Sequence, residues 1–457
     1  MPEPEDIDEF ARLFSGFLER MQAPPLVNAG ESVRERLLAH LGTASEELPV
    51  VAASFPSFDL PNVQLAVEAW FDSFELIGMA GPDRGHYSLS ELLQVAELRR
   101  YGVGAVDYQR ISIAVDEEMD CVGFGFYLGV QGDDRYVALL RAANEQHGRM
   151  TVTLEILAVD KSAGERFLGA LPPLMLEHNV FRGKVLSFEG HEFGHGVGPF
   201  RLHRRPTVSR GDVVMPEGVL ERVEREVIGI AEHREAMLRA GQHLRRGVLL
   251  YGPPGTGKTH TVRYLLSRLP EFTVVLLAGT SIRYISDACG LARLLQPALV
   301  VLEDCDLVAE ARDFVHGSEN PLLFQVLNEM DGLAEEADVA FLLTTNRVDI
   351  LEPALSQRPG RIDLAVEVPL PDAPGRARLL SLYGPALTLS PGVVEEVVAL
   401  TDGTTASFTK ELVRRAVLLA AEKDAIPGDT ELRDAAAELL SSRDTLTRRL
   451  LGATDPS

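Results

Sequence analysis

The sequence has 457 residues, which is too long for one ordinary hydrophobic core, so two or three domains are expected. Its composition, 46% hydrophobic and 25% charged, is typical of a folded globular chain, and no apolar run reaches the roughly 18 residues that a transmembrane helix needs. The net charge of −24 argues against general binding to DNA or RNA, because phosphate contacts require clustered lysine and arginine side chains.

The chain begins with an acidic segment, residues 1–25. Its first ten residues carry five acidic side chains and no basic one, the reverse of a secretory or mitochondrial leader, so we expect a cytoplasmic protein. Apolar residues recur at helical spacing up to a pair of prolines, which predicts an amphipathic helix that either packs on its own domain or docks a partner. The side chains on its apolar side are Phe10, Leu13, Phe14, Phe17 and Leu18.

Residues 26–205 mix helical and strand-like patterns, which predicts an α+β domain. Helical patterns cover 31–41, 61–74, 88–100 and 161–170. Strand-like runs cover 106–115, 122–130, 150–159, 184–188 and 200–204. These patterns assign no catalytic role to the domain.

One motif in this domain matches a zinc-protease pattern. His191, Glu192 and His195 form H-E-x-x-H, in which two histidines on one helical face hold zinc and the glutamate acts as general base. Glycines at positions 190, 194, 196 and 198 each cost about 1 kcal/mol in a helix interior, and strand-like runs flank the motif. A hairpin loop is therefore the expected structure, and a zinc protease is kept as an alternative function.

From residue 206 the pattern changes to short apolar strands that alternate with helices. Such alternation predicts a parallel sheet with helices on both faces, here an α/β module with a five-stranded sheet within residues 206–373. Residues 374–457 show only helical patterns and are expected to form a small helical subdomain. The expected strands cover 247–251, 272–277, 298–303, 339–345 and 364–368.

A glycine-rich loop follows the first of these strands and leads into a helix. The loop matches G-x-x-x-x-G-K-[ST] in the strand–loop–helix context that a phosphate-binding loop requires. Its glycines let backbone N–H groups converge on phosphates, Lys258 is expected to reach the β- and γ-phosphates, and Thr259 is expected to ligate Mg²⁺. The residues expected to bind the nucleotide are Gly252, Pro253, Pro254, Gly255, Thr256, Gly257, Lys258, Thr259 and His260.

Polar side chains follow two other strands of the predicted sheet. Glu303 and Asp304 end the third strand, and Asn346 ends the fourth. In open α/β sheets ligands bind at the carboxyl ends of the strands. We therefore expect Glu303 and Asp304 to hold Mg²⁺ together with Thr259 and to orient the attacking water. Asn346 is expected to hold that water or the γ-phosphate, with a strand-end cap as the alternative.

These ordered motifs resemble the AAA family of P-loop ATPases, the group that contains protein-remodelling ATPases. The resemblance covers about half of the chain, from about residue 215 to about residue 430, and its last segment resembles the helical-lid motif that closes the nucleotide site. The amino-terminal part resembles segments of bacterial ATPases of this kind to which no role is attached. The matching segments are 246–259, 303–312, 327–332, 344–347, 351–363 and 401–408.

The resemblance implies ATP as the nucleotide, Mg²⁺ as its metal ion and a ring, usually a hexamer, as the assembly. Arg358 and Arg361 would then be arginine fingers that reach the γ-phosphate of a neighbouring subunit and stabilise charge on the transferring phosphoryl group. The alternative is that one of them, more readily Arg361, pairs with an acid in its own subunit. Residues 281–287 correspond to the family's pore loop, where Tyr284 either lines a pore or packs within the subunit.

One departure from the family pattern bears on the rate of hydrolysis. Most AAA proteins have Asp-Glu where this chain has Glu303-Asp304, so the acid aligned with the water-polarising position is Asp304, which is one methylene shorter. A displacement of about 1 Å in an active site can cost about 100-fold in rate. Slow turnover is therefore an open alternative.

The main functional hypothesis is an oligomeric ATPase that hydrolyses ATP and remodels a protein substrate chosen by the amino-terminal domain. Neither a membrane nor a nucleic acid is expected as a partner. One alternative is an ATP-gated assembly scaffold or switch that hydrolyses slowly. The other is the H-E-x-x-H zinc protease.

Overall fold

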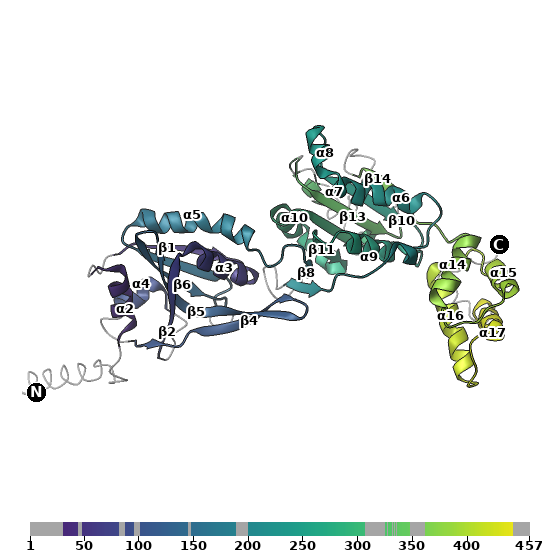
Figure 1. The fold of residues 1–457 in the computed structure, drawn as a ribbon, viewed down its shortest axis with the longest axis horizontal. Helices are drawn as coiled ribbons and strands as arrows, with labels where there is room; N and C mark the ends of the chain where they lie inside the picture. Colours follow the sequence, from purple (N-terminus) through teal and green to yellow (C-terminus); the bar gives the residue numbers. More distant parts are fainter. Residues whose placement is uncertain are drawn as a thin grey trace, which may run out of the picture. The chain divides into compact units, whose positions relative to one another are not determined.

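The structure, a computed structural model, divides into two compact units, Met1–Val180 and Phe181–Ser457, each with its own hydrophobic cores (Figure 1). None of the helices in the part of the chain that the structure describes has the length and apolar character to cross a membrane. The described residues are 31–43, 48–81, 87–95, 101–144, 148–188, 200–306, 325–326, 328–330, 332, 334, 336–347 and 362–441.

The first unit is an antiparallel sheet with helices on both faces, which confirms the predicted α+β domain. Among the described residues the strand order is β1-β7-β6-β5-β2-β3, and β4 pairs with the first half of β5. The strands are β1 (Val50–Phe55), β2 (Ser73–Met79), β3 (Val103–Gly104), β4 (Asp107–Ala114), β5 (Glu117–Gln131), β6 (Asp134–Arg141) and β7 (Val152–Ala158). The helices are α2 (Val33–Leu41), α3 (Leu60–Trp70), α4 (Leu89–Val95) and α5 (Lys161–Glu177).

Successive residues of β5 pack against different helices of this unit. Phe126 belongs to the cluster formed with α2 and α4, whereas Tyr127 belongs to the cluster formed with α3 and α5. This alternation follows from the period of two along a strand. Because both faces of the sheet are covered, the middle of β5 is a continuous apolar run and not an alternating one.

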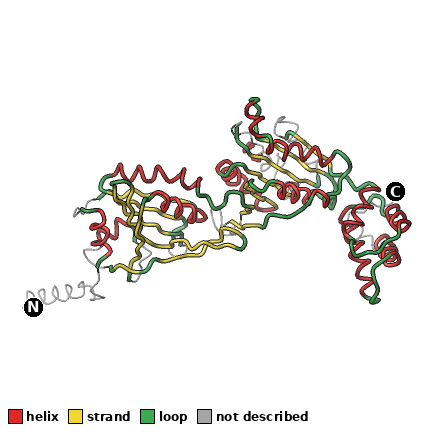
Figure 2. The backbone as a smooth tube through the Cα atoms, viewed as in Figure 1, coloured by secondary structure: helices red, strands yellow, loops and turns green. Residues whose placement is uncertain are grey.

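The second unit contains the predicted parallel sheet, and its strands are the yellow segments of the tube in that part of Figure 2. In the described part, β14, β10, β13, β12 and β11 lie side by side in parallel. Two more strands extend the sheet, β8 parallel to β11 and β9 antiparallel to β8. The strands are β8 (Val185–Phe188), β9 (Phe200–His203), β10 (Arg246–Tyr251), β11 (Thr273–Ala278), β12 (Ala298–Glu303), β13 (Val339–Thr345) and β14 (Leu364–Glu367).

The placement of β8 and β9 differs from the sequence expectation, which put both with the amino-terminal domain and a boundary at residue 205. Pairing with β11 makes them part of the second sheet, and the compact units divide after Val180. The side chain of Arg205 fixes the end of this hairpin, because its guanidinium donates to the carbonyl oxygens of Leu266, Leu269, Gly183 and Phe272.

Helices cover both faces of the second sheet. One core is formed with α10, and the other with α6, η4 and α9. The stretch 219–239 forms four consecutive helical segments, of which η4 has π-helical geometry. The elements before the lid are η3 (Arg210–Asp212), α6 (Val219–Glu224), η4 (Arg225–Gly229), α7 (Ile230–Glu232), α8 (Arg234–Arg239), α9 (Lys258–Arg268), η5 (Gly279–Tyr284) and α10 (Ile285–Leu294).

The carboxyl-terminal part is helical in its described residues, as predicted, and we call it the lid. Its helices pack around Phe408, which is fully buried. Side chains cap two of them: Asp372 accepts from the N–H of Gly375, and Thr405 accepts from the N–H of Phe408. The helices are α14 (Ala373–Tyr383), α15 (Pro391–Leu400), α16 (Ala406–Ala421) and α17 (Asp429–Leu440).

Candidate functional site

The glycine-rich loop connects β10 to α9. Gly252 has a φ of 144°, and a Cβ at this position would lie 2.3 Å from the carbonyl oxygen of Val368. Gly257 has a φ of 108° directly before α9 begins at Lys258. Only glycine adopts such torsions without strain, which explains why the loop needs these residues. The loop therefore leads directly into the amino terminus of α9, where the N–H groups and the helix dipole attract anions.

Lys258 is folded back onto its own loop. Its Nζ donates to the carbonyl oxygens of Gly252 at 2.8 Å and Pro253 at 2.9 Å. Burial lowers the pKa of Lys258, while the carboxylates of Asp304 and Asp306 act in the opposite direction. The lysine thus lies within the electrostatic reach of the acids that follow β12.

The acids after β12 and the amide after β13 form one hydrogen-bonded group. Asn346 Nδ2 donates to Asp304 Oδ1 at 3.2 Å, so two residues that the sequence predicted for one site are in contact. Asp306 Oδ1 accepts from Thr345 Oγ1 at 2.9 Å and from the N–H of Asn346 at 3.1 Å. Asp306 therefore fixes the end of β13 and, through it, Asn346.

Glu303 lies at the other side of this group, next to the first turn of α9. Burial raises the pKa of Glu303, and a hydrogen bond with the Thr259 side chain opposes that shift. Thr259 and Glu303 are thus in contact, as expected for two residues predicted to share a metal ion.

The chemistry of these residues fits Mg²⁺. This ion is usually bound by one or two carboxylates, a hydroxyl and phosphate oxygens, and only rarely by a complete protein cage. Among the described residues, no three or more His, Cys, Asp or Glu side chains are grouped so that they could hold a metal ion by themselves. Thr259, Glu303 and Asp304 supply the oxygen ligands that such a shared site needs.

A hollow beside the loop was missed by the sequence analysis. It is formed by residues 214–216, by Thr256 of the loop, by Pro371 and Gly375 at the start of the lid, and by Ala406 of α16. Residues 214–216, Pro371 and Gly375 belong to no motif, because they contribute backbone and small or apolar side chains. Their one sequence signal is indirect, since the segment 401–408 matched a lid motif. In the structure this motif reaches the loop, where Ser407 N donates to Gly255 O at 3.1 Å.

Several predicted residues lie outside the described residues: Arg358, Arg361, the motif from His191 to His195, and the helix of 1–25. Tyr284 is described and half-buried. Its ring packs on Phe188 of β8, with the ring centroids 5.6 Å apart, and the Arg283 guanidinium lies 4.8 Å from its centroid. Within this chain Tyr284 therefore packs inside its own unit, and whether it also lines a pore stays a prediction.

A buried strand, a glycine-rich loop, a helix that begins at a lysine and acids at the ends of neighbouring parallel strands define a P-loop nucleotide-binding protein. Comparison with known proteins specifies the class further. The family described as "ATPase family associated with various cellular activities (AAA)" matches residues 248–370. The chain belongs to this family of ATPases.

The relatives share the region around this site. The chain is 30% identical over 294 residues to the proteasome-activating nucleotidase of Thermococcus onnurineus, covering 58% of this chain and 74% of that protein. It is 36% identical over 206 residues to the 26S proteasome regulatory subunit 10B of Dictyostelium discoideum, covering 42% and 52%. It is 30% identical over 305 residues to the human ATPase family gene 2 protein homolog A, covering 63% and 34%. The chain thus spans about a third to three quarters of these relatives.

Proposed function

We propose that this chain binds and hydrolyses ATP with Mg²⁺ in a homo-oligomeric ring, and that it uses the energy to remodel a protein substrate selected by the first unit. The observation that carries the proposal is the grouping of Lys258, Thr259–Glu303 and Asp304–Asn346 at the carboxyl edge of one parallel sheet. Two relatives named for activating or regulating a proteasome support a protein as the substrate.

Each residue has one task in this reaction. The loop N–H groups and Lys258 hold the phosphates. When ATP binds, the Lys258 ammonium donates to phosphate oxygens in place of the two loop carbonyl oxygens that it contacts here. Thr259 and Glu303 hold Mg²⁺, which when bound would neutralise charge between the β- and γ-phosphates. Asp304 accepts the proton of the attacking water, and Asn346 orients Asp304 through their hydrogen bond. Arg358 and Arg361 reach the γ-phosphate of the adjacent subunit.

The decisive experiment is the steady-state ATPase rate against protein concentration, for wild type, Lys258→Ala and Arg358→Ala. We expect the wild-type rate per subunit to rise with assembly and both variants to lose at least about 100-fold in kcat. Arg433→Ala serves as a control, because this exposed lid arginine pairs with Glu396 inside the lid. An Arg358→Ala protein that hydrolyses like wild type at every concentration would exclude a finger acting between subunits.

A nucleotide-gated switch is the second candidate, and the geometry of Asp304 favours it. This shorter acid is the one held by Asn346, and its backbone has a φ of 50°. The hydrogen bond holds the carboxylate at the end of β13, and the side chain is one methylene shorter than a glutamate. Tight ATP binding with turnover below about one per minute, together with assembly that depends on ATP, would establish the switch and contradict the motor.

A further inference from the structure

A short segment before α6, residues 209–213, is held from three sides, and we call it the strap. The Ser209 N–H donates to Asp212 Oδ2 at 2.8 Å, which closes the strap on itself. Its backbone continues directly into residues 214–216, which line the hollow beside the glycine-rich loop. The position of the strap therefore sets one wall of that hollow.

The first contact of the strap is with the helix that follows the glycine-rich loop. His260 Nε2 lies 3.1 Å from the carbonyl oxygen of Asp212. His260 is the neighbour of Thr259, so this hydrogen bond joins the strap to the first turn of α9. The strap is thereby attached to the turn that also carries Thr259, the residue predicted to ligate Mg²⁺.

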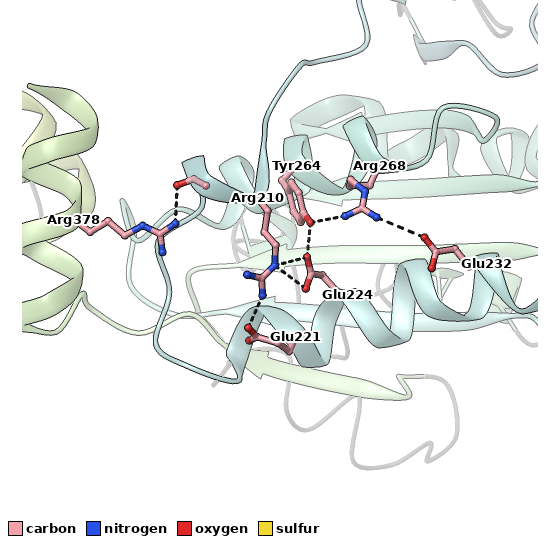
Figure 3. Close-up of polar contacts among 8 residues, drawn as sticks. Arg210, Glu221, Glu224, Glu232, Tyr264, Arg268 and Arg378 are labelled. Atoms are coloured by element: carbon pink, nitrogen blue, oxygen red, sulfur yellow. Dashed lines mark hydrogen bonds and ion pairs between the residues drawn. The ribbon is translucent and has the colours of Figure 1, made fainter. Parts of the chain in front are cut away.

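The second contact is with α6, through Arg210. Figure 3 shows Arg210 reaching from the strap to Glu221 and Glu224 of this helix, with its Nε 3.1 Å from Glu224 Oε1. Glu224 also accepts a hydrogen bond from the Tyr264 hydroxyl, and Tyr264 is a fully buried residue of α9. One carboxylate thus joins strap, α6 and α9. Exposure of the Arg210 and Glu221 side chains weakens their own ion pair, so the shared Glu224 carries this link.

The third contact comes from the lid. Arg378 of α14 extends toward the strap in Figure 3, and its Nη2 donates to the carbonyl oxygen of Gly211 at 2.9 Å. Two residues earlier on the same helix, Arg376 is buried and faces its own subdomain, where its guanidinium contacts the carbonyl oxygens of Val398 and Pro371. Arg376 therefore holds α14 to the lid, and Arg378 holds α14 to the strap.

We propose that Arg378 is a positioning residue for nucleotide binding, because its hydrogen bond to Gly211 holds the lid against the strap and so closes the hollow beside the glycine-rich loop. The inference rests on the proposed ATP site. Residues 214–216, which directly follow the strap, line that hollow together with Pro371 and Gly375 at the start of the lid and Ala406 of α16. The Arg378–Gly211 hydrogen bond joins the strap to α14 of the lid, and so connects the two segments that lead into these lining residues.

The test measures ATP affinity and turnover in the full-length protein for Arg378→Met, Arg378→Lys and the control Arg414→Met. The methionine keeps the aliphatic stem and removes the donors, so we expect Kd and KM for ATP to rise about three- to ten-fold, with a smaller change in kcat. The lysine keeps a charged donor and should recover part of the affinity. Arg414 pairs with Glu411 inside α16, so its replacement removes the same charge from the lid and should leave Kd unchanged.

A double variant tests whether the strap is the shared element. Arg210→Met alone should also weaken ATP binding, and adding Arg378→Met should cost less than the sum of the two, because a strap released on one side positions the hollow less well. Hydrogen exchange gives an independent readout. ATP should protect the backbone amides of 209–213 in wild type and Arg414→Met, and fail to do so in Arg378→Met.

Two outcomes overturn the inference and separate it from the proposed function. If Lys258→Ala weakens ATP binding while Arg378→Met stays within two-fold of wild type, the site is right and the role of Arg378 is wrong. The same conclusion follows if Arg414→Met weakens binding as much as Arg378→Met. If Lys258→Ala binds ATP like wild type, the proposed site itself is wrong and the inference falls with it.

Discussion

At the scale of single residues, Asp304 combines a strained backbone conformation, which costs free energy, with hydrogen bonds that stabilise it. A non-glycine residue with a φ of 50° costs roughly 1–2 kcal/mol. Its N–H nevertheless donates to Thr344 Oγ1 at 3.1 Å, and its carboxylate accepts from Asn346. Strained residues of this kind gather at functional sites, where the surrounding contacts hold them. The sequence pattern identified this acid, but its backbone conformation follows from contacts with β13 that no local pattern contains.

Asp304→Asn tests the role of this carboxylate. Asparagine keeps the shape and the oxygen that Asn346 contacts, so ATP binding should be retained, whereas loss of the basic oxygen should lower kcat by about 100- to 10,000-fold. Asp304→Glu restores the longer acid of the family pattern and should raise kcat above wild type if reach limits the rate. Single-turnover hydrolysis and ATP affinity are measured for both. An Asp304→Asn protein within ten-fold of wild-type kcat would contradict the assignment of the water-activating acid.

At the scale of elements, the parallel strands were predictable and the antiparallel ones were less so. Strands β10 to β13 are buried along most of their length and appear as short apolar runs between turn residues, which is a strong signal. In the first unit β2 begins at Ser73, inside the helix predicted over 61–74. The start of this strand was missed because its first residues are exposed and do not alternate between buried and exposed. Helix α5 was predicted to end by residue 170, yet it continues through Pro172 and Pro173 to Glu177, packed on α3.

The candidate site likewise has a part that was predictable from the sequence and a part that was not. The residues that bind phosphate and metal in P-loop proteins were found because their chemistry needs fixed residue types at fixed spacing. The hollow was missed because residues 214–216 and 371–375 are far apart in sequence and supply shape instead of chemistry. Arg205 was assigned to the end of the amino-terminal domain, yet tertiary contacts make it a cap for the carboxyl end of α9.

Arg205→Met should destabilise the second unit. The guanidinium donates to four carbonyl oxygens at 2.7 to 3.0 Å, and three of them belong to the end of α9 and the turn that follows it. Methionine fills similar space and leaves these acceptors without their donor, so we expect a loss of about 2–4 kcal/mol in the free energy of unfolding. Denaturant unfolding measures it, with the exposed arginine of α6 replaced in Arg222→Met as the control. An equal loss of unfolding free energy in the two variants would show that the positive charge of an arginine matters and the hydrogen bonds of the Arg205 cap do not.

At the scale of the whole molecule, the border between the two units is sharp to one residue. The Val180 N–H donates to Asn62 Oδ1 of α3 at 3.0 Å, whereas the ring of Phe181 packs edge-to-face on Phe200 of β9 with ring centroids 5.2 Å apart. Adjacent residues thus belong to different cores. Each unit can therefore keep its fold independently of the other, which the proposed function needs.

Division of the chain between Val180 and Phe181 should therefore give two folded proteins. We expect Met1–Val180 to unfold in one cooperative transition, because its sheet is covered on both faces by its own helices. The complementary Phe181–Ser457 should bind ATP with an affinity within about three-fold of the full chain, since every described contact of the candidate site lies inside it. Calorimetry and ATP titration measure the two halves. A first half without a cooperative transition would show that its cores depend on the second.

If the first unit selects the substrate, the second half alone should hydrolyse ATP at a rate that a substrate protein no longer changes, and a retained response would place substrate recognition in the ATPase unit.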